Sequence, residues 1–324
     1  MAADDIRSGL AELNEAYAAI RERLDRFVVG NVDLKELVFI GLLSGGHILI
    51  EGYPGTAKTT LVKSLARTLG CRFSRFQCAV DSQPADIIGV RIFHPDSREF
   101  VMKRGPIFSN FMLIDEINRL APKTQGAFIE AMSERQATVD GETIPIESPF
   151  MVIATQNPFE FEGTFPLIEA QKDRFMFSTR MGHLEEDEEL ELIRREFSGE
   201  LDWTAYTDSL TPVLNEAAIK RFISLTREVH IEGSVLGYIR DLVIATRKHG
   251  DIRIGVSARG SISLVRGSRA VAALGKRSYV IPDDVKRLIP MVFSHRVVLT
   301  REAEISGVTS DQVIREITDA VEVP

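Results

Sequence analysis

Residues 52–59 read Gly-Tyr-Pro-Gly-Thr-Ala-Lys-Thr, a stretch that departs from the phosphate-loop pattern GxxxxGK(S/T) only at Ala57. In such a loop, backbone N–H groups turn inward around phosphate oxygens, and the N-terminus of the next helix faces the same anion. Lys58 is expected to contact the β- and γ-phosphates of a nucleotide, and Thr59 to ligate Mg²⁺. The apolar run at 47–50 and the helical stretch at 59–69 predict strand, loop and helix, the opening of an α/β unit.

The segments on either side extend this α/β pattern. Short apolar runs at 73–77, 111–114, 150–154 and 175–179 alternate with helical stretches such as 123–134, which predicts a mostly parallel sheet covered by helices on both faces. After Gly182 helical periodicity dominates, at 186–197, 214–229, 234–248, 258–276, 282–295 and 309–321, with short strands only near 252–254 and 297–299. We therefore predict an α/β domain over residues 1–183, which begins with a helix at 4–27, and a smaller helical domain over residues 184–324.

Two acidic residues, Asp115 and Glu116, directly follow the apolar run 111–114. A buried strand that ends in carboxylates delivers them to the edge of the sheet where ligands bind in such folds. We expect Asp115 to hold the water shell of Mg²⁺ and Glu116 to polarise an attacking water. Together with the phosphate loop upstream, this pair predicts nucleotide hydrolysis.

Composition narrows the class of protein further. The chain has 324 residues and a net charge of −8, a charge that disfavours a protein whose main function is to bind nucleic acid.

The two cysteines, Cys71 and Cys78, do not have the spacing of a metal site or a redox motif, and we interpret both as core residues of a reduced, cytoplasmic protein. No signal peptide is visible and no apolar run is long enough to span a bilayer, so we predict no membrane insertion. The acidic run 185–189 fits the first turn of a helix, with a partner-binding patch as the alternative.

The chain resembles the AAA+ ATPases, and more narrowly their MoxR family, from about Phe27 to Val285. The phosphate loop resembles the GxPGxAKT loop of that family, in which alanine before the lysine is usual. The other matching segments are Val28–Gly30 (the adenine side), Leu113–Arg119 (DEINR), Pro122–Gln125, Glu130–Arg135, Val139–Glu142, Ile153–Pro158 (ATQNP), and Glu169–Phe175 (EAQ-DRF). Residues 83–104 look like the hairpin that is inserted around the second helix of the ATPase domain, and Asp140-Gly141 is the turn of a second hairpin. Such hairpins face the pore or a partner in rings of this clade, with plain surface hairpins as the alternative.

This resemblance implies the fold and the roles of individual residues. The fold would be a P-loop AAA+ three-layer α/β sandwich with a parallel sheet, followed by a smaller all-α lid. Lys58 and Glu116 would act in catalysis with Asn157 as sensor 1, Arg174 as an arginine finger that reaches a neighbouring subunit, and Arg259 as sensor 2. Family members more often read GASPR where this chain reads Gly255-Val-Ser-Ala-Arg259, so the match there is looser. The nucleotide would be held by Val29, Gly30, Gly52, Pro54, Gly55, Thr56, Ala57, Lys58, Thr59 and Thr60, and Mg²⁺ by Thr59 and Asp115.

The function implied is that of a cytoplasmic, Mg²⁺-dependent ATPase, a homo-oligomer that is expected to form a hexameric ring. It would remodel or activate partner proteins in a chaperone-like way, with von Willebrand factor A domain proteins as the expected clients and no nucleic acid partner. Three alternatives stay open: the ATPase subunit of a magnesium- or cobalt-chelatase complex, a helicase-type remodeller, and a binding module that is switched by ATP without turnover. The sequence names neither the client nor the ring size.

Overall fold

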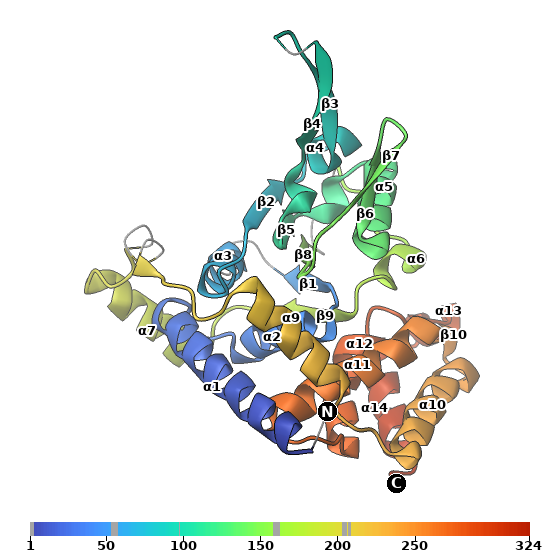
Figure 1. Ribbon diagram of the computed structural model, residues 1–324. Coiled ribbons are helices and arrows are strands. Elements are labelled where there is room, and N and C mark those ends of the chain that lie inside the picture. Colours follow the sequence, from blue (N-terminus) through green and yellow to red (C-terminus); the bar gives the residue numbers. More distant parts are fainter. Residues whose placement is uncertain (1–2, 53–57, 97, 158–162, 203–205, 207–208) are drawn as a thin grey trace.

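Five parallel strands in the order β2–β5–β8–β1–β9 form the central sheet of the computed structural model (Figure 1). The structure describes residues 3–52, 58–96, 98–157, 163–202, 206 and 209–324. The strands are β1 Ile48–Gly52, β2 Phe73–Gln77, β5 Phe111–Asp115, β8 Met151–Gln156 and β9 Phe177–Met181. Since all five run the same way, their carboxyl ends meet at one edge and their amino ends at the other.

The inner strands β5, β8 and β1 are buried on both faces, which explains why they read as nearly continuous apolar runs. The edge strand β2 is only partly buried and carries polar side chains. Leu113 and Ile153 point into one core, whereas Met112, Ile114 and Val152 point into the other. The predicted α/β sandwich with a parallel sheet is therefore confirmed. The fifth strand starts two residues later than predicted, because Met176 donates its N–H to the carbonyl of His47 before the ladder begins.

Helices cover the two faces. One core contains residues of α1 Ala3–Phe27, α2 Val32–Ser44 and α3 Lys58–Thr68, and the other contains residues of α4 Pro84–Ile88 and α5 Pro122–Glu134. Helix α2 is buried almost all round, because it lies between the sheet and the helices of the C-terminal half. Short helical turns η1 Pro106–Phe108, η2 Ile117–Arg119 and α6 Glu169–Lys172 connect the larger elements.

The C-terminal half is almost entirely helical, as predicted for the lid. Its helices are α7 Glu186–Phe197, α9 Glu216–Arg227, α10 Gly233–Lys248, α11 Ala258–Leu274, α12 Pro282–Phe293, α13 Arg301–Ile305 and α14 Ser310–Ala320. A two-stranded sheet of β10 Ile252–Ile254 and β11 Val298–Leu299 joins them. Helices α9, α11 and α12 contribute to the same core as α1 and α2, so this half packs against the sheet domain through continuous apolar contacts.

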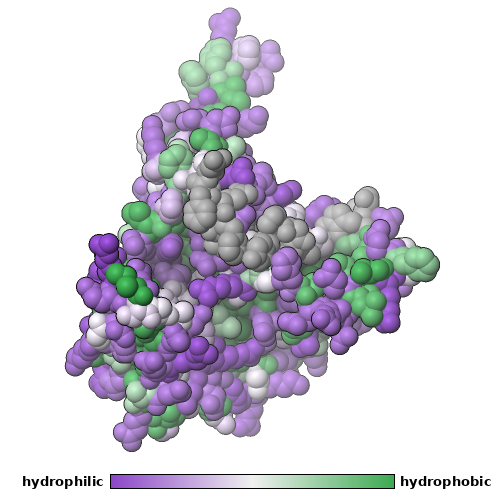
Figure 2. Space-filling model, turned by 180° about the vertical axis from the view of Figure 1, so that it is seen from behind, coloured by the Kyte–Doolittle hydropathy of each residue, from purple (hydrophilic) through white to green (hydrophobic). Residues whose placement is uncertain are grey.

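Two hairpins, β3 Gly89–His94 with β4 Glu99–Arg104 and β6 Gln136–Val139 with β7 Glu142–Pro145, project on the side away from the helical half (Figure 1). The first hairpin exposes apolar side chains on both of its faces. Ile92 and Val101 pair on one face and Phe93 and Phe100 on the other, and Figure 2 shows this apolar band directly below the hydrophilic end of the hairpin. Each helix among the described residues is too short or too polar to cross a membrane.

Candidate active site

Lys58 begins α3 at the carboxyl end of β1, directly after the phosphate loop. Its Nζ donates to the carbonyl of Gly52 over 3.2 Å. Burial lowers the pKa of this ammonium, and the nearby carboxylates of Asp115 and Glu116 oppose that shift. Thr59 and Thr60 follow on the first turn of α3. The predicted contacts Pro54, Gly55, Thr56 and Ala57 lie outside the described residues.

Asp115 ends β5 at the same edge of the sheet and is buried. Its Oδ2 accepts from Nε of Arg75 at 2.7 Å, and its Oδ1 accepts from the hydroxyl of Thr155 at 3.3 Å. The carboxylate already faces a cation, and together with the hydroxyl of Thr59 it offers the hard oxygen donors that Mg²⁺ prefers. Among the described residues no group of three or more His, Cys, Asp or Glu could hold a metal.

Glu116 follows Asp115 in the left-handed backbone region, with φ 58° and ψ 51°. The hydroxyl of Thr155 accepts from its backbone N–H at 3.0 Å. Its Oε2 accepts from Nε2 of Gln77 at 3.1 Å and lies 2.8 Å from Nε of Arg119. A non-glycine residue in this region is uncommon, and such residues concentrate at functional sites. The surrounding contacts hold the carboxylate at the edge of the sheet, beside Asp115.

Asn157 follows β8, the strand next to β5, so it lies at the same carboxyl edge as Glu116. Its carbonyl accepts from Nδ2 of Asn118 at 3.4 Å. Lys58, Asp115, Glu116 and Asn157 therefore gather at the carboxyl ends of three adjacent strands, where open α/β sheets bind ligands.

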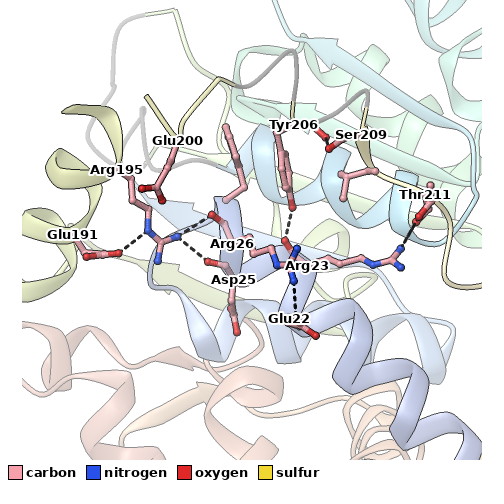
Figure 3. Close-up of a pocket in the computed structure, with 12 residues that line it drawn as sticks. Glu22, Arg23, Asp25, Arg26, Glu191, Arg195, Glu200, Tyr206, Ser209 and Thr211 are labelled. Carbon is pink, nitrogen blue, oxygen red and sulfur yellow. Dashed lines mark hydrogen bonds and ion pairs between the residues drawn. The ribbon is translucent and has the colours of Figure 1, made fainter. Parts of the chain in front are cut away.

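Val29 and Gly30 lie between α1 and α2, and α7 packs over them. Gly30 has φ +66°, and a Cβ built there would lie 2.6 Å from Oε2 of Glu188. A neighbouring cavity of about 820 Å³ separates the end of α1 from α7 (Figure 3). Arg195 crosses it and donates to the carbonyls of Asp25 and Arg26, each at 2.9 Å. Phe27 and Tyr206 stack on its wall with ring centroids 4.3 Å apart.

Arg174 and Arg259 line a different cavity of about 450 Å³. Gly45, Gly46 and His47 also line this cavity. Nε of Arg174 is buried and has no hydrogen-bond partner among the described residues. Arg259 lies 3.7 Å from Oδ2 of Asp173, which also accepts from the hydroxyl of Ser257. The cavity therefore contains Arg174 and Arg259 side by side, and the ion pair of Arg259 with Asp173 is long.

This arginine cavity and the Lys58 group lie at opposite edges of the sheet. His47 lines the cavity just before β1 begins, and Lys58 bonds to Gly52, where β1 ends. Five strand residues at about 3.3 Å each put roughly 17 Å between the two ends. The fold thus brings Lys58, Asp115, Glu116 and Asn157 together, and Arg174 with Arg259, but it keeps the two groups apart.

Several polar residues at these sites were not singled out from the sequence. Arg75 and Gln77 on β2 contact the two predicted carboxylates, since Gln77 is the register partner of Asp115. Their signal in the sequence was weak, because polar and aromatic residues are mixed throughout β2. The arginine cavity also contains Arg135, Arg227, Arg266 and Arg296, which come from four separate elements, and no local pattern joins them.

Comparison with known proteins agrees with this geometry. Residues 47–177 match the model of the ATPase family associated with various cellular activities (AAA), and residues 244–317 match an AAA lid domain. A Bacillus subtilis protein, YeaC, is 43% identical over 94% of this chain and 93% of its own length. Chaperone MoxR1 of Mycobacterium tuberculosis is 38% identical over 97% of this chain and 84% of its own length. The crystal structure of a protein assigned as an ATPase from Cytophaga hutchinsonii superposes with a TM-score of 0.91 at 35% identity, covering 99% of this chain and 98% of the other.

Proposed function

The chain belongs to the MoxR family of AAA+ ATPases, and from this premise we propose that it hydrolyses ATP at Mg²⁺-dependent sites shared between neighbouring copies in a ring. The single observation that carries the shared site is the separation of the two groups of residues. Arg174 and Arg259 lie at the amino edge of the sheet, too far from the Lys58 group to contact the same phosphate. A site that needs both groups takes the arginines from the next copy.

Within one copy, the carboxyl edge of the sheet binds the nucleotide and prepares the water. Lys58 contacts the β- and γ-phosphates, and the backbone of the loop that contains Gly52, Pro54, Gly55, Thr56 and Ala57 encloses them. Thr59 and Asp115 hold Mg²⁺, which neutralises phosphate charge when bound. Glu116, fixed by Gln77 and Arg119, accepts a hydrogen bond from the attacking water, and Asn157 helps to position that water. Val29, Gly30 and Thr60 complete the nucleotide contacts.

The neighbouring copy supplies permanent positive charge. Arg174 is partly exposed and lines the cavity, so the terminal NH₂ groups of its guanidinium can donate to a phosphoryl oxygen that enters from the neighbouring copy. Arg259 is half exposed and holds Asp173 only at long range, so it is available to a second oxygen. Fixed donors aimed at oxygens that gain charge in the transition state are a large source of rate enhancement. This arrangement makes turnover a property of the assembly.

The work done by this cycle is chaperone-like remodelling of protein clients. The name of the Mycobacterium tuberculosis relative, Chaperone MoxR1, supports this role and favours it over the chelatase-subunit alternative. A hexamer, a cytoplasmic location and clients with a von Willebrand factor A domain are our more specific proposals. The exposed apolar band of the β3–β4 hairpin is a suitable contact for an unfolded or loosely folded client segment.

The test is steady-state ATP hydrolysis with Mg²⁺ across a range of protein concentrations, for the wild type, Glu116→Gln and Arg174→Ala. We expect specific activity to rise with concentration, and both variants to bind ATP while turnover falls by at least about 100-fold. Activity that is independent of concentration, with Arg174→Ala fully active, would contradict the shared site. Binding without turnover by the wild type at every concentration would favour the ATP-switched binding module.

A further inference from the structure

Helix α7 has an unusual polarity, because it turns its apolar side chains outward. Leu190, Ile193 and Phe197 follow each other at spacings of three and four residues, and their exposed fractions are 45%, 59% and 93%. A surface helix of a globular protein normally turns such a stripe toward the core. Figure 2 shows apolar side chains gathered on the outer part of the lobe that α7 forms.

Polar residues of α7 face the rest of the chain instead. The carboxylate of Glu188 lies against Gly30. Arg195 pairs with Glu191 and donates to the carbonyls at the end of α1 (Figure 3). The helix is therefore held in place by polar contacts, and its apolar stripe is available for an external partner. Contiguous exposed apolar surface of this kind marks interaction sites.

The first turn of α7 adds a second property, a concentration of negative charge. Glu185, Glu186, Asp187 and Glu189 are all exposed. A partner for this helix should therefore offer positive charge beside an apolar rim.

The arginine cavity described above has both features. Beyond Arg174 and Arg259 it presents Arg135 at the end of α5, Arg227 at the end of α9 and Arg266 on α11. Arg227 and Arg266 are exposed, and the half-exposed side chain of Ile262 lies beside them. The acids that line it are Glu134 and Asp173, and Asp173 is already bonded to Arg296 at 2.9 Å. Positive charge thus exceeds negative charge at this site.

We propose that α7 of one copy docks on the arginine cavity of the next copy. The acidic first turn meets Arg135, Arg227 and Arg266, and the stripe of Leu190, Ile193 and Phe197 covers the rim at Ile262. This inference rests on the proposed function, because α7 flanks Gly30 on the nucleotide side and the cavity contains the arginines that reach that nucleotide. The contact is heterologous, since two different surfaces meet, and repeated contacts of this kind close into a ring when the rotation allows.

The direct test is a disulfide cross-link between Asp187→Cys and Arg266→Cys in one chain, with each single-cysteine variant as a control. In a head-to-tail assembly every copy contributes one cysteine to each of two contacts, so oxidation should give a ladder of covalent oligomers on a non-reducing denaturing gel. Single-cysteine variants should give no ladder. The native thiols interfere little, because Cys78 is buried and burial raises the pKa of Cys71 to about 12.

A second measurement separates this inference from the proposed function. Phe197→Glu should raise the concentration needed for assembly by at least tenfold in sedimentation velocity. Its matched control is Ile305→Glu, which places the same charge on α13 at a side chain that is 78% exposed. That control should assemble like the wild type. The docking of α7 is overturned if Phe197→Glu assembles at the same concentrations as the wild type and the double-cysteine variant gives no ladder. That result would not affect the proposed shared ATPase site. A wild type that never assembles and is active as a monomer overturns both.

Discussion

At the scale of single residues, the proposed site takes Glu116 and Arg174 from two different copies. This leads to a prediction that would not hold for an active site within one chain. A 1:1 mixture of Glu116→Gln and Arg174→Ala proteins should regain ATPase activity, although each protein alone is inactive. The reason is that an interface with Glu116 from one variant and Arg174 from the other has a complete set of residues. With random mixing, about one interface in four is complete. The measurement is steady-state hydrolysis after the two proteins are mixed and incubated.

The control for this experiment is a mixture of two Glu116→Gln preparations, one of which also carries Arg174→Ala. No interface in that mixture contains Glu116, so it should stay inactive. Recovery in the control, or no recovery in the complementary mixture despite confirmed co-assembly, would show that the arginine does not act across the interface.

Part of this site could be predicted from the sequence, because its residues are close together in the chain. Lys58 follows a glycine turn, and Asp115 and Glu116 end an apolar run, so local spacing carries the information. Arg75 and Gln77 could not be assigned from local spacing, since they reach the carboxylates only through the pairing of β2 with β5. The roles of Asn157, Arg174 and Arg259 came from the family resemblance and stay predictions.

At the scale of elements, a buried histidine directly precedes β1, and its protonation should lower stability in acid. His47 accepts from the N–H of Val152 at Nδ1 and donates to the carbonyl of Met132 from Nε2, so the neutral ring satisfies both contacts. Burial, reinforced by the charge of Arg135, lowers its pKa to about 3, whereas the unfolded value is near 6.5. Below pH 6.5 the unfolded chain therefore binds a proton that the folded chain does not, and stability falls as pH drops toward 3.

We expect this histidine to contribute about 1.4 kcal/mol to the loss of unfolding free energy between pH 7.5 and pH 5.5. In His47→Gln, which cannot titrate, the decrease over this range should be smaller by about that amount. Urea unfolding at the two pH values measures the difference. Equal pH dependence in the two proteins would mean that the pKa of His47 is the same in the folded and the unfolded chain.

The helical elements show where periodicity is informative and where it is not. The predicted helix at 186–197 is confirmed by α7, and its acidic residues do form the first turn. The apolar spacing within α7, however, suggests a stripe turned to the core, whereas the structure turns it outward. Periodicity reports that a stripe exists but not which surface covers it, and a surface on a second copy leaves no separate trace in the sequence.

At the scale of the whole molecule, Arg296 connects the helical half to the amino edge of the sheet. This buried guanidinium donates to Asp173 and to the carbonyls of Phe175, Met176 and Val292. Asp173 in turn contacts Ser257 and Arg259. The network fixes Arg174 and Arg259 relative to each other, and it includes an ion pair removed from solvent.

We expect Arg296→Met to lower the free energy of unfolding by about 3–5 kcal/mol, because it breaks the buried ion pair with Asp173 and removes the donor to several buried carbonyls. The matched control is Arg287→Met, which removes a more exposed pair with Glu36 and should cost about 1 kcal/mol or less. Urea titrations of both variants provide the comparison. Similar losses in the two proteins would show that the buried network does not hold the halves together.

The placement of the proposed catalytic residues on opposite edges of one sheet also has a genetic consequence. A subunit that lacks both Glu116 and Arg174 would inactivate its own site and the site of the copy beside it. Two sites would fail for each such chain that enters a ring. An allele of this kind should therefore be dominant when expressed together with the wild type, and its effect should grow faster than its share of the subunits.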